Sequence, residues 1–248
     1  MKDESQKQFR LFSGTLKLPA RMLIITVFLA GCFGLSWSGW KLTETLDNRS
    51  LVLIVLASIS SGFAIRIPVP ARRLQSLSIT LSDIFIFVAI FAERPELAVV
   101  IGAVEALISS YRVRVSHAHK WIFNVGLLTS AALLSGWAFL QLAGGTSSFK
   151  TLIPSALVAI VVYFGLNSLL ISAVISLSVE QQVWTIWSKN LLWAAPSTLA
   201  NGLSAICLML VLSSLGGPME VAMLPVVLVI FSAHRIHRRS QEREAEAK

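Results

Sequence analysis

The chain has 248 residues, of which 55% are hydrophobic and only 14% carry charge. About a quarter of the residues of a soluble domain are charged, so this composition excludes an ordinary water-soluble fold. The 21 Lys and Arg residues outnumber the 13 Asp and Glu residues, which gives a formal net charge of +8. In a soluble protein this excess would suggest a nucleic-acid partner. Here most of the basic residues fall in loops on one side of the predicted membrane domain, which accounts for the excess. We therefore expect no nucleic-acid binding.

The apolar residues form runs whose length suits a lipid bilayer. Crossing about 30 Å of hydrocarbon at about 1.5 Å per residue takes about 20 helical residues. The sequence therefore predicts an all-α fold, a polytopic transmembrane helical bundle of about eight spans, in a range of about six to eight. The predicted spans are residues 22–40, 51–65, 79–91, 97–111, 121–142, 152–178, 191–215 and 221–233.

The third and fourth predicted spans are short. Residues 92–96, which include a proline and charged side chains, form the turn between them. We expect either a tight hairpin of shallow helices or a partly re-entrant pair that the longer helices shield from lipid.

Basic residues indicate the side on which each loop lies. If the spans cross in turn, 17 of the 21 Lys and Arg residues fall on one side, and the exceptions are Lys41, Arg49, Arg94 and Lys150. Cytoplasmic loops are rich in Lys and Arg, so both termini are predicted in the cytoplasm. The expected location is the bacterial cytoplasmic (inner) membrane. Residues 1–21 form a basic leader, 22–233 the transmembrane domain and 234–248 a charged helical tail.

Both cysteines, Cys32 and Cys207, lie inside apolar runs, which argues against a disulfide framework. Residues 29–32, with the sequence LAGC, resemble a bacterial lipoprotein cleavage box with Cys32 as the lipid acceptor. Residues 33–40 stay apolar, as they would in an uninterrupted span. We therefore expect no lipid on Cys32.

Motifs for catalysis or metal binding are absent from the sequence, which has no HExxH, CxxC, GxSxG or Walker loop. The histidines lie in predicted loops or the tail. We expect no enzyme activity, no cofactor and no metal.

The remaining chemistry lies in polar side chains at membrane depth. Glu105 is mid-helix, where an ionised carboxylate costs about 2.5–3.5 kcal/mol, so it should face the bundle interior or be protonated. Asp83 fits either a helix-cap or interfacial role, or a ligand site. The asparagines either form interhelical hydrogen bonds, worth about 0.6 kcal/mol each, or line a polar pocket. The hypothetical ligand-binding set is Glu105, Tyr163, Asn167, Asn124, Asn201 and Asp83.

Five short motifs carry a resemblance to a known group of proteins. They are LSITLSD at 77–83, PELA at 95–98, VEALISS at 104–110, WIFN at 121–124 and YFGLN at 163–167. In this order they resemble the multi-helix membrane input regions that precede HD-GYP or GGDEF cyclic-di-GMP domains in bacteria. The resemblance implies that Glu105, Asn124 and Asn167 occupy the acidic and asparagine positions of that pattern.

The chain departs from this pattern after the charged tail, because no HD pair or GYP triplet follows before Lys248. It is therefore expected to be either a stand-alone sensor or scaffold, or a fragment of a longer protein. The leading hypothesis is a non-enzymatic input module that relays a membrane or periplasmic cue through its last helix to a cytoplasmic signalling protein or a second copy of itself. The alternative is a small-solute transport component, similar to vitamin-binding membrane subunits, with its substrate in the polar pocket.

Overall fold

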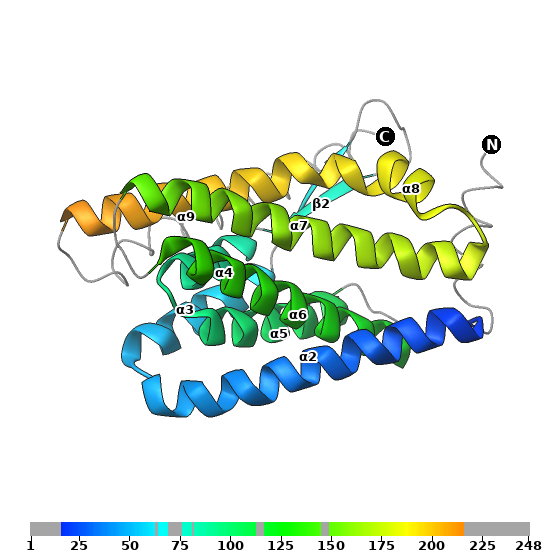
Figure 1. The fold of residues 1–248 in the computed structure, drawn as a ribbon, viewed down its shortest axis with the longest axis horizontal. Coiled ribbons are helices and arrows are strands. Elements are labelled where there is room, and N and C mark those ends of the chain that lie inside the picture. Colours follow the sequence, from blue (N-terminus) through cyan, green and yellow to red (C-terminus); the bar gives the residue numbers. More distant parts are fainter. Residues whose placement is uncertain are drawn as a thin grey trace, which may run out of the picture.

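A computed structural model describes residues 16–62, 64–68, 76–80, 82–112, 117–144 and 149–215. These residues form a helical bundle with one short antiparallel strand pair (Figure 1). The helical fold class is confirmed. The elements are α2 (Leu18–Thr45), α3 (Asn48–Ser61), β1 (Ala64–Pro68), β2 (Ser76–Thr80), α4 (Asp83–Phe91), α5 (Pro95–Arg112), α6 (Ala118–Ala143), α7 (Phe149–Val179), α8 (Val183–Ile186), a π-helical turn (Trp187–Leu191), a 3-10 turn (Leu192–Ala194) and α9 (Ala195–Leu215).

Three helices in the described part of the chain are long and apolar enough to cross a membrane. They are α2, α6 and residues Thr151–Val179 of α7. The chain is thus a membrane protein by the composition of its helices. The eight-span count and the cytoplasmic termini stay predictions. The predicted span 221–233 and the tail lie outside the described residues.

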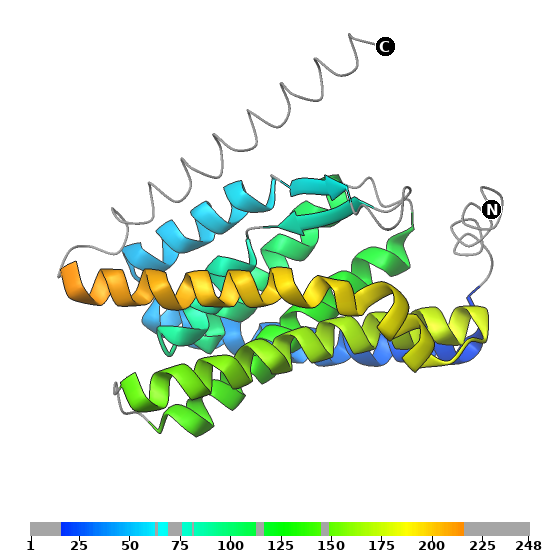
Figure 2. The ribbon, with the colours of Figure 1, turned by 90° about the horizontal axis from the view of Figure 1, so that it is seen from above.

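Two predicted span boundaries differ from the structure. The second span was expected to continue to residue 65, but α3 ends at Ser61, Gly62 caps it, and β1 follows. The third span was expected from residue 79, but β2 occupies that position and the helix starts at Asp83. Short apolar runs do not distinguish a strand from a helix by periodicity, which explains both differences. Figure 2 shows the strand pair beside the end of α3.

Helix α4 lies at the centre of the bundle (Figure 1). Its residues from Ile84 to Phe91 are all buried, and those from Phe85 to Ile90 have no exposed surface. A helix that is apolar on every face is covered either by lipid or by other protein elements, and here other elements of the bundle cover α4. With 9 residues, α4 is about 14 Å long and is too short to cross the hydrocarbon alone. It is therefore a short helix shielded by its neighbours, joined to α5 by the tight turn at Ala92–Arg94.

Helices α2 and α6 run in parallel and touch through glycines. A Cβ placed on Gly126 would lie 2.6 Å from the Cα of Phe28, and one on Gly31 would lie 2.5 Å from the Cα of Gly126. Farther along, Gly34 faces Leu133. Small residues allow such close backbone packing in membranes. The parallel arrangement agrees with the predicted order of crossings, in which both helices start on the same side.

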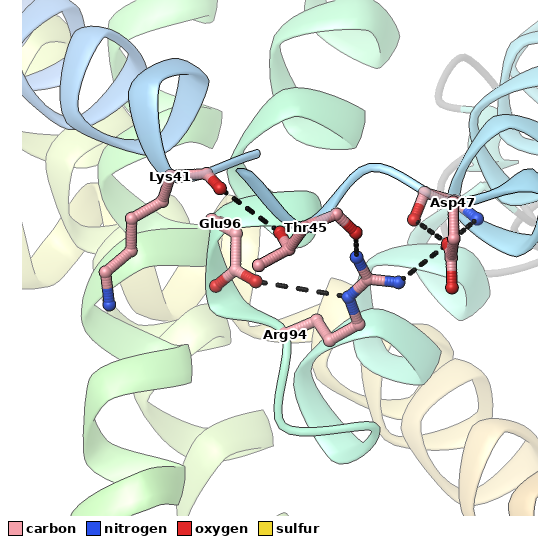
Figure 3. A network of polar contacts seen from close by, with 6 residues as sticks. Lys41, Thr45, Asp47, Arg94 and Glu96 are labelled. Carbon is pink, nitrogen blue, oxygen red and sulfur yellow. Dashed lines mark hydrogen bonds and ion pairs between the residues drawn. The ribbon is translucent and has the colours of Figure 1, made fainter. Parts of the chain in front are cut away.

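A polar network joins α2, α3 and α5 at one end of the bundle (Figure 3). Arg94 donates to Asp47 over 3.0 Å and to the Thr45 carbonyl over 2.5 Å, and its Nε lies 4.0 Å from Glu96 Oε1. Asp47 also caps α3 by accepting from the side chain and backbone N–H of Ser50, and these bonds hold its pKa well below the usual range. This contribution to stability is present at neutral pH and is lost only as the pH falls through the lowered pKa.

Candidate functional site

The site begins at the first turn of α4, where the apolar helix meets polar groups. Ser82 precedes the helix and is fully buried. Its hydroxyl donates to Glu105 Oε1 over 2.5 Å. Glu105 lies on α5 and is 4% exposed. The expectation that Glu105 faces the bundle interior is therefore confirmed.

Asp83 is the first residue of α4 and accepts hydrogen bonds from two other helices. The Tyr163 hydroxyl on α7 donates to Oδ1 over 3.1 Å, and the Asn201 amide on α9 donates to Oδ2 over a longer 3.4 Å. Tyr163 and Asn201 are both buried. We call Ser82, Asp83, Glu105, Tyr163 and Asn201 the polar cluster. It joins α4, α5, α7 and α9.

The helix dipole and aromatic packing both favour the arrangement of the polar cluster. A carboxylate in the first turn of a helix is favoured by the helix dipole, which helps to place Asp83 here. The Tyr163 ring packs edge-to-face against Phe87, with centroids 5.1 Å apart. The hydroxyl is therefore directed by a ring that is itself buried.

The structure brings Asp83, Glu105, Tyr163 and Asn201 together, and it places the other two predicted residues elsewhere. Asn124 donates to Ser110 Oγ over 3.0 Å and ties α6 to α5, which is the interhelical role left open by the sequence. Asn167 is half-buried one turn beyond Tyr163 on α7, outside the polar cluster.

Ser82 is a member of the polar cluster that was not predicted from the sequence. Its position immediately before the acidic first residue of an apolar helix was the available signal, because serine at that position commonly satisfies helix N–H groups. In this chain Ser82 makes no such cap, and its hydroxyl bonds Glu105 instead.

An irregular helical segment leads into α9. Between α8 and α9 the backbone passes through the π-helical turn and the 3-10 turn. Trp187, in the π-helical turn, donates from Nε1 to Ser168 Oγ over 2.9 Å and packs on Trp184 with ring centroids 4.8 Å apart. Short π and 3-10 stretches within helices often mark functional hinges. This irregular segment leads directly into α9, the helix that carries Asn201.

The sequence predicts no lipid on Cys32 and no metal site. Helix α2 continues without a break through Cys32, as expected for an uninterrupted span. In the parts of the chain that the structure describes, no group of three or more His, Cys, Asp or Glu side chains could hold a metal ion.

The apolar helices, the shielded α4 and the polar cluster define a membrane protein with a polar centre inside its helical domain. Residues 39–238 match the MASE9 family, which is a family of membrane-associated sensory domains. The chain belongs to the MASE9 family. Comparisons with curated proteins and with solved structures give no match.

Proposed function

We propose that the chain is a non-enzymatic sensor or scaffold module of a bacterial cytoplasmic membrane, which relays a membrane or periplasmic cue through its last helix to a cytoplasmic signalling partner or a second copy. The observation that carries the proposal is the match of residues 39–238 to a family of membrane-associated sensory domains. The resemblance to input regions that precede cyclic-di-GMP domains supports the same role. The alternative of small-solute transport has no support.

The polar cluster supplies a mechanism for the relay. Its hydrogen bonds tie α4 to α5, α7 and α9, so a cue that shifts one of these helices changes the bonds of the others. A hydrogen bond to a charged group contributes about 1.5–3 kcal/mol. Full conversion between two states needs about 5.5 kcal/mol, which is close to the sum of two such bonds. The polar cluster is thus large enough in energy to act as a two-state latch.

Helix α9 is the output side of this latch. Asn201, which donates to Asp83, lies on α9, and residues 216–248 follow α9 in the sequence. Release of Asp83 would free α9 to move about the π-helical turn, and this motion would reach the charged tail. The partner is bound by that tail, whose opposite charges at Arg238 and Glu242 favour a helix.

The test uses a photo-crosslinking amino acid at His237 or Gln241 in the full-length protein in its native membrane. We expect a cytoplasmic partner, or a second copy, to be captured, and its yield to change at least about threefold in Tyr163→Phe. The control is Tyr111→Phe, which removes the same hydroxyl group at a position outside the polar cluster. Tyr111 is 76% exposed. Equal yields in both variants would contradict the relay, and so would the absence of any captured protein.

A further inference from the structure

The first turns of α2 and α6 lie together at the end of the bundle opposite the Arg94 network. The two helices pack side by side in the same direction, so their N-terminal ends lie next to each other. Ile24 and Phe123, near these starts, pack in one apolar cluster with Val174 of α7. The starts of two long helices therefore meet at a single membrane interface, and neither has a side-chain cap. Each contributes backbone N–H groups and the positive end of its dipole.

Basic side chains gather at the same place. Arg21 of α2 acts electrostatically on His119, together with His117 and Lys120 from the start of α6. The His117 and His119 rings are stacked, with centroids 5.3 Å apart. We call these four residues the basic cluster. The positive charges of Arg21 and Lys120 favour a negatively charged group beside them.

Two further features concern the charged and polar groups near these helix starts. Glu180, at the end of α7, is held by Lys17, which keeps the pKa of this carboxyl below its usual range. The Nε2 atom of His119 is buried and makes no hydrogen bond to any residue in the described part of the chain. A buried imidazole nitrogen normally has a partner.

We propose that the basic cluster binds a phosphate group at the membrane interface, either the headgroup phosphate of an anionic phospholipid or a free phosphate. A phosphate monoanion or diester accepts from Arg21, Lys120, His119 and the open N–H groups of the helix starts. The headgroup layer of the bilayer lies at this level, because both spans begin here. This site is distinct from the polar cluster and does not depend on the relay.

Binding is measured on the full-length protein in nanodiscs by native mass spectrometry and by the imidazole nitrogen resonances of His119. Phosphatidylcholine discs with and without phosphatidylglycerol test the lipid, and inorganic phosphate added to phosphatidylcholine discs tests the free anion. We expect preferential retention of phosphatidylglycerol, or a phosphate-induced shift of the His119 resonances. The first result identifies a lipid headgroup and the second a soluble phosphate. If neither ligand moves the His119 resonances, the proposal is wrong.

Arg21→Gln with Lys120→Gln should weaken binding about thirtyfold, since each basic residue near an anionic surface contributes independently. The matched control, Lys41→Gln with Arg49→Gln, removes two charges at the other end and should leave binding unchanged. Equal losses in the two double variants would show general surface attraction and overturn the proposal. His117→Phe with His119→Phe removes the imidazole groups from the basic cluster and should also weaken binding. Unchanged binding in this double variant would contradict the role of the histidines.

Discussion

The Tyr163 hydroxyl donates a hydrogen bond over 3.1 Å to Asp83, a residue 80 positions earlier in the chain. This bond ties the first residue of the buried helix α4 to the middle of α7. Asp83 also accepts from Asn201, so the same carboxylate holds α9. A single carboxylate inside the bundle thus fixes the relative positions of three helices.

Tyr163→Phe should lower the free energy of unfolding by about 1–3 kcal/mol, because it removes one donor from a carboxylate inside the bundle. The aromatic packing on Phe87 is retained, so the loss reports the hydroxyl alone. Unfolding is measured by steric trapping in nanodiscs. Tyr111→Phe, at an exposed position, should change stability by less than about 0.5 kcal/mol. Equal effects in the two variants would show that the bond to Asp83 contributes nothing.

Glu105→Gln should preserve the fold and impair the relay. The amide oxygen still accepts from Ser82, so we expect stability to stay within about 1 kcal/mol of the wild type. The negative charge is lost, and crosslinking from the tail should fall at least about threefold. Glu44→Gln, an exposed control, should leave crosslinking unchanged. Wild-type crosslinking in Glu105→Gln would remove Glu105 from the site, as would greater stability with full crosslinking in Glu105→Leu.

Gly126→Ala should destabilise the α2–α6 contact by about 1–3 kcal/mol, because the added methyl group would meet the backbone of Phe28. Gly39→Ala is the matched control in α2, where a Cβ meets nothing within 4 Å. It should leave stability unchanged or raise it by up to about 1 kcal/mol through helix propensity. Thermal unfolding in detergent checks both variants. A stable Gly126→Ala protein would mean that the two helices are farther apart than the structure has them.

Reporter fusions test the predicted topology. Fusions after Ser116 and after Lys248 should report the cytoplasm, and a fusion after Gly145 the periplasm. The parallel arrangement of α2 and α6 requires that both helices start on one side, so the fusion after Ser116 also tests the structure. A periplasmic signal after Lys248 would show that the number of spans is wrong.

Helix positions and the buried polar residues could be predicted from the sequence, because long apolar runs and isolated polar groups are direct consequences of the lipid environment. Glu105 and Tyr163 were identified in this way. The pairing of Asp83 with Asn201 could not be predicted, because helical periodicity does not show which helix packs beside which. The strand pair was not predicted, because each strand is too short for its hydrophobic pattern to distinguish a strand from a helix. The π-helical turn before α9 leaves no distinct sequence signal.

Hydrogen–deuterium exchange of the full-length protein in nanodiscs tests the central claim most directly, namely that the polar cluster couples α4 and α7 to α9. The variants are Tyr163→Phe and the control Tyr111→Phe. We expect Tyr163→Phe to speed exchange in peptides from Ala195–Leu215 and from the tail, while peptides from α2 and α6 exchange as in the wild type. Faster exchange confined to α7, or spread evenly over all helices, would contradict the coupling.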